Sequence, residues 1–188
     1  QIKRLDDLGF VWDMNERAWE EGCRHLILYK KEFGNCFAVQ GFIYKGYTLG
    51  HWTASQRNKK DRLTPEQIKR LDDLGFVWKV TEYLWEEGYS HLTLYVQEFG
   101  HCLVPTKCTY KDYKLGQWVG RQRMEKKNLT PERIKRLDDI GFIWDVYEHA
   151  WEKGYKYIVA YKQEFGNCLP KRGSLYRGYD LSLWIKSQ

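Results

Sequence analysis

Basic side chains recur at a fixed interval along this 188-residue chain. The stretch "QRNKKDR" (56–62) is followed 66 residues later by "QRMEKK" (122–127), and a further basic stretch, "IKR", comes after each. Guanidinium and ammonium groups bind phosphate oxygens, so a periodic set of them can follow a nucleic-acid backbone. We therefore predict a nucleic-acid-binding site made of Arg57, Lys59, Lys60, Arg62, Lys69, Arg70, Arg121, Arg123, Lys126, Lys127, Arg133, Lys135 and Arg136.

The overall charge permits that prediction without requiring it. The chain has 31 basic and 25 acidic residues, a formal net charge of +6, and a pI near 8.9. Within "KRLDD", Lys69 can pair with Asp72 or Asp73 on one helix face, and such pairs would neutralise part of the site. The alternative is a structural or protein-interaction scaffold that uses an aromatic surface, because 14 Tyr exceed what three small cores need.

A shift of 66 residues aligns the whole chain with itself without gaps. All nine Trp then fall into three repeat positions, namely Trp12, Trp78 and Trp144; Trp19, Trp85 and Trp151; Trp52, Trp118 and Trp184. This periodicity predicts a tandem array. We divide it into residues 1–12 (the C-terminal helix of a preceding unit), two complete units at 13–78 and 79–144, and a truncated unit at 145–188. Because the chain begins and ends inside a unit, we expect it to be part of a larger protein.

Each unit is predicted to contain three helices, which makes the fold all-α with Trp-rich cores. Apolar residues of the first helix have helical spacing along one face: Trp85, Tyr89, Leu92, Tyr95 and Phe99. Gly88 interrupts this helix, as do Gly22 and Gly154 in the other copies, and glycine there costs about 1 kcal/mol relative to alanine. Close approach of a neighbouring Trp would explain these glycines, and so would inheritance from a recent duplication.

The second helix is predicted within "LGQWVGRQRMEKK" (115–127). Its inward face has the spacing of a buried helical stripe and consists of Leu115, Trp118, Val119 and Gln122. With that face turned inward, Arg121, Arg123, Lys126 and Lys127 must point away from the core or toward its edge. The basic residues of helices two and three are thus expected to gather at the junction between these helices.

The third helix has start and stop signals. Thr64 and Thr130 are predicted N-caps, and each is followed by a proline at the first helical position. Gly141 is the predicted left-handed stop, after which Phe142 and Trp144 are expected to fill the core. Asp13 and Asp145 are predicted to cap the first helix in the same way.

The ends of the third helix have electrostatic consequences. Its N-terminus offers free amides to a phosphate, and only Gln67 and Arg133 beside it are suited to contact base edges. Asp73 and Asp139 lie in the last turn, where the helix dipole disfavours acids. We expect both to have cationic partners, for example from the second helix.

No catalytic or metal site is predicted. Adjacent aspartates on a helix diverge by about 100°, and the five His do not share repeat positions apart from His25 and His91. His101, Cys102 and Cys108 have zinc-binding chemistry, but the other copies have Asn in place of the histidine and no counterpart of Cys108. We read the five cysteines as reduced thiols in an intracellular protein, and we expect no enzyme activity and no cofactor.

Three stretches in order resemble the helicase-associated domain family: "FGHCLVP", "LGQWVGRQR" and "LTPERIKRLDDIGFIW", with "WEKGY" opening the next unit. The resemblance covers the whole chain. It implies tandem three-helix units, which in this family often accompany helicase-like or restriction-type proteins, and a proposed role in nucleic-acid binding. The third copy departs from the pattern, with Ser182 in place of the glycine of "LGxW", and the first has "AVQ" in place of the proline-containing stretch. No phosphate-binding loop is present, so this segment is not the motor.

The leading prediction is therefore a repeat array that binds nucleic acid, DNA in preference to RNA, mainly through the sugar-phosphate backbone. The alternative is a scaffold whose partners are proteins. No apolar run approaches the roughly 18 residues of a membrane-spanning helix, so we expect no membrane partner. A DNA-binding array would be located in the nucleus or nucleoid.

Overall fold

The computed structural model describes Arg4 and residues 14–188. The helix expected at residues 1–12 and the cap expected at Asp13 thus lie outside the described residues, apart from Arg4. The chain divides into two compact units, residues 1–84 and 85–188. The first unit holds one complete repeat, and the second holds most of another repeat and the truncated one.

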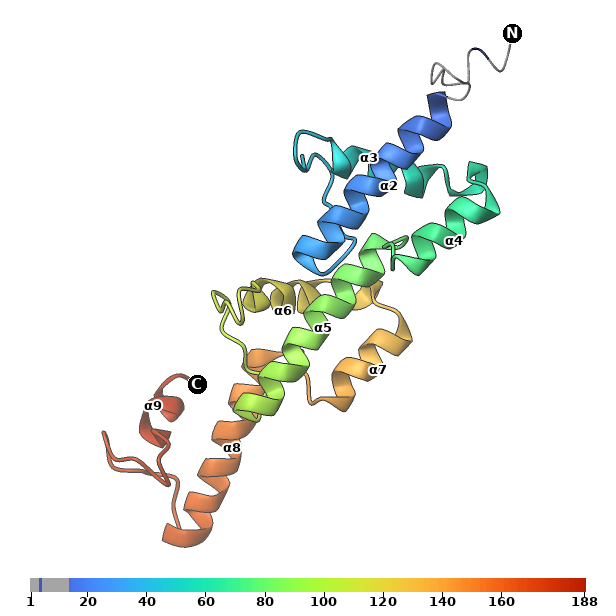
Figure 1. Ribbon diagram of the computed structural model, residues 1–188. Helices are drawn as coiled ribbons and strands as arrows, with labels where there is room; N and C mark the ends of the chain where they lie inside the picture. Colours follow the sequence, from blue (N-terminus) through green and yellow to red (C-terminus); the bar gives the residue numbers. More distant parts are fainter. Residues whose placement is uncertain (1–3, 5–13) are drawn as a thin grey trace. The chain divides into compact units, whose positions relative to one another are not determined.

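The described residues form helices and connecting turns, with no strand among them (Figure 1). The first repeat contains α2 (Met14–Phe33), α3 (Leu49–Asn58), the 3-10 turn η1 (Lys60–Arg62) and α4 (Pro65–Asp73). The second contains α5 (Val80–Phe99), α6 (Leu115–Met124), η2 (Lys126–Asn128) and α7 (Pro131–Asp139). The truncated repeat contains α8 (Val146–Phe165) and α9 (Leu181–Lys186). The prediction of an all-α fold built from three-helix repeats is confirmed.

The second helix of each complete repeat is shorter than predicted. It ends at Asn58 or Met124, and the basic residues that follow lie in the 3-10 turns η1 and η2 instead of on a continuing α-helix. Because a 3-10 turn bonds each amide to the third residue back, it lets the chain change direction at once toward helix three. Of the predicted cations, Lys60, Arg62, Lys126 and Lys127 therefore lie on these short turns.

The third helix begins and ends as the sequence predicts. The Thr64 hydroxyl accepts from Gln67 N, while the Gln67 side chain accepts from Thr64 N, which completes a capping box. Thr130 Oγ1 accepts from Arg133 N at 3.3 Å. Gly75 and Gly141 have φ values of 70° and 73°, so each provides the left-handed residue that ends its helix.

Replacing Thr130 with alanine is expected to destabilise the second repeat by about 1 kcal/mol, because Arg133 N then loses its cap. Urea unfolding followed by circular dichroism, together with amide exchange in α7, would measure the loss. Thr130→Ser keeps the hydroxyl and is the matched control. Equal destabilisation by serine and alanine would contradict the capping role.

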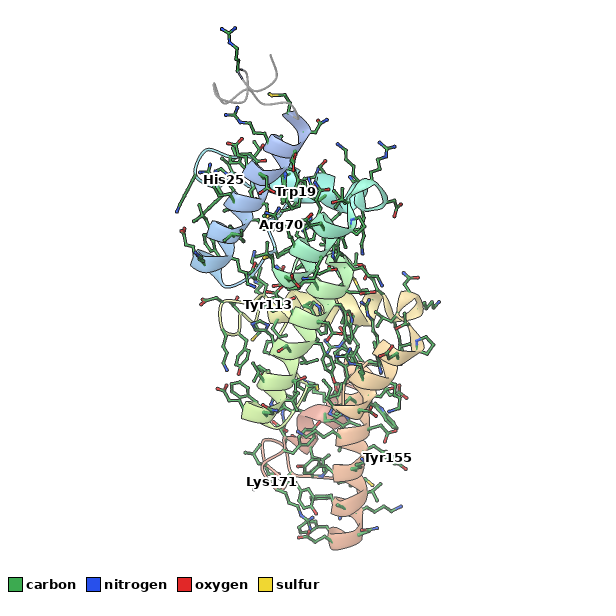
Figure 2. The ribbon with its side chains drawn as sticks, turned by 45° about the vertical axis from the view of Figure 1, so that its right-hand side comes forward. Trp19, His25, Arg70, Tyr113, Tyr155 and Lys171 are labelled. Atoms are coloured by element: carbon green, nitrogen blue, oxygen red, sulfur yellow. The ribbon has the colours of Figure 1, made fainter. Side chains whose placement is uncertain are left out.

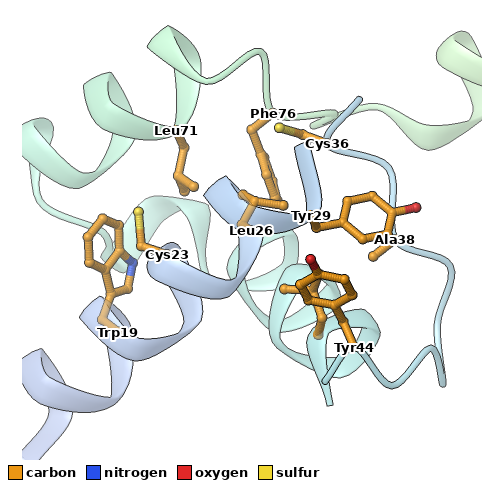
Figure 3. Close-up of a cluster of buried hydrophobic side chains, with 10 residues drawn as sticks. Trp19, Cys23, Leu26, Tyr29, Cys36, Ala38, Tyr44, Leu71 and Phe76 are labelled. Carbon is orange, nitrogen blue, oxygen red and sulfur yellow. The ribbon is translucent and has the colours of Figure 1, made fainter. Parts of the chain in front are cut away.

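Each complete repeat has a core to which all three helices contribute. Leu26 of α2, Leu49 of α3 and Leu71 of α4 are completely buried, and Phe76 is 5% exposed. Figure 3 shows Leu26 and Cys23 on the side of α2 that faces Leu71. Leu92, Leu115, Leu137 and Phe142 occupy the same positions in the second repeat. Helix three therefore closes the core that the first two helices build.

The glycine inside each long helix is required by a tryptophan. A Cβ added to Gly22 would lie 2.1 Å from Trp52, and the same distance separates Gly88 from Trp118 and Gly154 from Trp184. No side chain fits there, because atoms cannot approach so closely. Of the two explanations, the close approach of a neighbouring indole is therefore confirmed.

Candidate nucleic-acid interface

Two of the predicted arginines direct their guanidinium groups into the protein. Arg57 Nε donates to the carbonyl of Val77 at 2.7 Å, and its guanidinium lies 5.1 Å from the centre of the Phe76 ring. In the second repeat, Arg123 Nε donates to the carbonyl of Ile143 at 2.8 Å, and its guanidinium lies 5.4 Å from the centre of the Phe142 ring. Burial lowers the pKa of both arginines. They lie at the edge of the core, as predicted, but they join helix two to the end of helix three and do not face a phosphate in solution.

Arg70 and Arg136 are paired within the fold. Both nitrogens of the Arg70 fork donate to Glu20 of α2, and Arg136 donates to Glu86 of α5 at 2.6 and 2.8 Å. Each guanidinium also lies 4.7 Å from a tryptophan ring centre, that of Trp19 for Arg70 and that of Trp85 for Arg136. Arg70 and Trp19 are labelled in Figure 2. The hydrogen bonds hold the pKa of Glu20 and Glu86 below the usual value and raise that of the arginines. These arginines attach helix three to helix one.

The lysines of helix three are paired as well. Lys69 Nζ lies 2.9 Å from Asp73, and Lys135 Nζ lies 2.8 Å from Asp139, in both cases one helical turn apart. The aspartates do have cationic partners, as expected, but the source suggested for them is wrong. These partners come from the same helix, because the i,i+4 spacing brings the two side chains together on its exposed face.

The two residues suggested for base contacts, Gln67 and Arg133, also make contacts within the fold. Gln67 completes the Thr64 capping box. Arg133 lies over Trp85, with 4.7 Å between its guanidinium carbon and the ring centre. Few backbone N–H groups at the start of α4 are available to a ligand, because Pro65 has no N–H and the Thr64 hydroxyl accepts a hydrogen bond from Gln67 N. This terminus therefore has fewer amides to offer a phosphate than a helix without the proline and the capping hydroxyl.

The remaining predicted residues are exposed and form no ion pair with a carboxylate within Arg4 and residues 14–188. We call this set the turn cations: Lys59, Lys60, Arg62, Lys126 and Lys127 at the turns, together with Arg121 in the last turn of α6. Lys60 and Lys126 lie 4.4 and 4.5 Å from the ring centres of Trp78 and Trp144. The indole nitrogens donate to Asp72 and Asp138 in turn, at 2.6 and 2.7 Å. The same lysine, indole and carboxylate thus meet at the turn of both complete repeats.

An open groove of about 1030 Å³ lies beside the first turn. Lys59 and Arg62 line it together with the indoles of Trp19 and Trp52. Glu16, Glu20 and Glu66 line it too, so its walls have mixed charge. The groove therefore offers flat apolar surface and hydrogen-bonding groups, whereas the exposed η1 turn provides the excess of positive charge.

The sequence-based prediction did not include one periodic set of cations. Lys45, Lys111 and Arg177 follow the first Tyr of "YKGY", "YKDY" and "YRGY", with φ values of 48–49°. In each turn the two tyrosines exchange backbone hydrogen bonds, and the first tyrosine donates its hydroxyl to a glutamate of helix one. The recurring Tyr-x-x-Tyr spacing was the available signal. Lys45 and Arg177 are paired with Glu32 and Glu164, which reduces the free charge at these turns.

The equivalent cysteines of the two complete repeats, Cys36 and Cys102, are part of the packed cores. Cys36 and Cys102 are buried, and their thiols donate to the carbonyls of Leu74 and Ile140 at 3.1 and 3.2 Å. Burial raises the pKa of both thiols. Cys102 thus directs its sulfur to the end of helix three, while the neighbouring His101 ring accepts from Leu103 N. All five thiols are unpaired, and the described residues contain no group of three or more potential metal ligands.

Two further observations concern the chain as a whole. None of the described helices combines the length and hydropathy needed to cross a lipid bilayer. The sequence profile of the helicase associated domain matches residues 16–79 and again residues 82–145, which together make up more than half of the chain. No curated protein and no solved structure matches the chain. The two successive profile matches, on repeats with the same three helices, show that the chain belongs to the helicase-associated domain family.

Proposed function

We propose that the array binds nucleic acid through the turn cations and performs no catalysis of its own. The observation that carries this proposal is that some of the predicted basic residues are engaged within the fold, whereas others are exposed. The cations on helix three and the two half-buried arginines are engaged within the fold, whereas the turn cations are exposed and lack carboxylate partners among the described residues. Positive charge thus remains at the same place in both complete repeats.

The chemistry of these residues favours contacts with the phosphate backbone. Lysines on a short turn provide point charges without a fixed hydrogen-bonding geometry, which suits phosphates and does not distinguish bases. Each phosphate neutralised contributes about −0.9 to the slope of log affinity against log salt on duplex DNA. The turn cations together therefore set an upper limit of about 5 on the size of that slope. We propose DNA as the partner in preference to RNA, with the nucleus or nucleoid as the location that follows.

Reversing the first turn (Lys59→Glu, Lys60→Glu and Arg62→Glu) is expected to weaken binding to duplex DNA by at least about tenfold and to reduce the salt slope. The matched control reverses Arg17, Arg24 and Lys31, which are exposed on α2 of the same repeat and change the net charge equally. Electrophoretic shift titrations with DNA and RNA at two salt concentrations would measure both. An equal loss in the control would show that only net charge matters, and no binding by the unmodified chain at micromolar concentration would refute the proposal.

The mixed charge of the groove favours a second candidate, a repeat that binds protein. Glutamates alternate there with basic residues around two indoles, a combination of apolar and polar surface that is typical of protein interfaces. A protein ligand held by the groove would remain bound when the turn cations are reversed. It would be released when Trp52, which lines the groove, is replaced.

A further inference from the structure

Two of the turn cations lie against an aromatic ring. Lys60 Nζ is 4.4 Å from the ring centre of Trp78, and Lys126 Nζ is 4.5 Å from that of Trp144. Neither ammonium group forms an ion pair with a carboxylate among the described residues. Because a ring attracts a cation without neutralising it, both lysines are restrained and keep their full charge.

Each indole is itself fixed by two contacts. Trp78 Nε1 donates to Asp72 at 2.6 Å, and the Trp78 ring centre lies 4.7 Å from that of the buried Phe76. In the second repeat, the equivalent contacts of Trp144 measure 2.7 and 4.7 Å. A carboxylate and a core side chain thus determine the orientation of the ring, so the lysine above it has a fixed surface to rest on.

The carboxylate of this arrangement contacts the indole and not the lysine. Neither Asp72 nor Asp138 forms an ion pair in the part of the chain that the structure describes. A carboxylate that accepts the indole N–H polarises the ring, which makes the face of the ring more attractive to an ammonium group. The neighbouring Asp73 instead pairs with Lys69 and neutralises it. The fold therefore orients one lysine in each complete repeat while leaving its charge free.

We infer that Trp78 and Trp144 are positioning residues for phosphate contacts made by Lys60 and Lys126, an inference that rests on the proposed binding of nucleic acid. A lysine side chain loses much rotamer freedom when it is immobilised on a phosphate. The indole already restricts that freedom in the unbound chain, so less is lost on binding. None of the other turn cations lies over a ring within the described residues, so each complete repeat has one preorganised phosphate contact.

Replacing both indoles (Trp78→Leu with Trp144→Leu) is expected to weaken binding to duplex DNA about tenfold, because two lysines are no longer preorganised. Phenylalanine at both positions keeps an aromatic face under each lysine and should stay within about twofold of the unmodified chain. The slope of log affinity against log salt should change little in either variant, because no charge is removed. Electrophoretic shift titrations at two salt concentrations would measure affinity and slope.

A double-mutant cycle separates positioning from a general effect on the fold. In a background of Lys60→Met and Lys126→Met, the leucine replacements should cause no further loss of DNA affinity, because the lysines that they would release are absent. Lys59→Met and Lys127→Met remove the adjacent turn cations and are the matched control background, in which the tenfold loss should persist. Equal losses in the two backgrounds would overturn the positioning role.

A second measurement requires no change to an indole and complements circular dichroism as the check on folding. The ring current of an indole shields nuclei above its face, so the ε-methylene protons of Lys126 should resonate at higher field than those of Lys127 in the unbound chain. Equal shifts would overturn the inference. Absence of DNA binding by the unmodified chain would overturn the proposed function and this inference with it, whereas unchanged binding by the folded leucine variant would overturn the inference alone.

Discussion

Replacing Gly88 with alanine is expected to destabilise the second repeat by about 2 kcal/mol, although alanine is the better helix former. The gain in helix propensity is about 1 kcal/mol, whereas overpacking costs about 1–3 kcal/mol. Here the overlap is severe, because the new Cβ would lie 2.1 Å from Trp118 Nε1 and 2.2 Å from Cε2. The indole cannot yield easily, since it packs against Trp85, with 6.1 Å between ring centres. We therefore place the packing cost at or above the top of its usual range.

Gly120 is the matched control for this prediction. It lies on α6, and a Cβ built there meets nothing within 4 Å. Gly120→Ala should therefore be neutral or stabilising by up to about 1 kcal/mol. Urea unfolding followed by circular dichroism would measure both variants. In a Trp118→Ala background, Gly88→Ala should cost little or become favourable, and additive effects in that double-mutant cycle would contradict the packing explanation.

Removing the Trp85 side chain is expected to cost about 3–5 kcal/mol, the range for buried aromatic residues replaced with alanine. Trp85 is 5% exposed, and its indole nitrogen donates to the buried Gln122 at 3.0 Å. Tyr89 stacks on it, and Arg133 and Arg136 lie over it. Its loss would leave a cavity and deprive Gln122 of a hydrogen bond at the same time.

Trp151→Ala provides the comparison within the same chain. Trp151 has matching ring neighbours but is 43% exposed, because no third helix covers it in the structure. Its replacement should therefore cost clearly less than that of Trp85. Repeat arrays unfold unit by unit, so amide hydrogen exchange in α5 and α8 is the appropriate local measurement. Equal costs at the two positions would show that helix three contributes little to the core.

Much of the fold could be predicted from local sequence. Thr64, Pro65 and Gly75 mark helix three because caps and left-handed stops depend on the chemistry of single residues. The buried face of α6 followed from its spacing, since Leu115, Val119 and Gln122 are buried. A close tryptophan was one of two explanations for the glycines inside the first helix, and the structure places an indole of helix two there.

The candidate site was harder to predict, because charge in a sequence does not show how much of it remains free. Arg57 and Lys59 look equivalent in "QRNKK", yet Arg57 donates to the Val77 carbonyl and Lys59 is exposed beside the turn. Arg70 and Glu20 are 50 residues apart, so no local pattern reveals their pairing. Lys69 and Asp73 form a pair that the i,i+4 spacing did allow for.

The sequence by itself determined the 66-residue period, the helix boundaries set by caps and glycines, and several core residues, whereas Phe99, expected on the same face as Trp85, is 49% exposed. These depend on interactions within a few residues or on exact repetition. Only the tertiary structure decided which arginines are engaged within the fold, because the carboxylates, carbonyls and rings that contact Arg57, Arg70, Arg123 and Arg136 come from other parts of the chain.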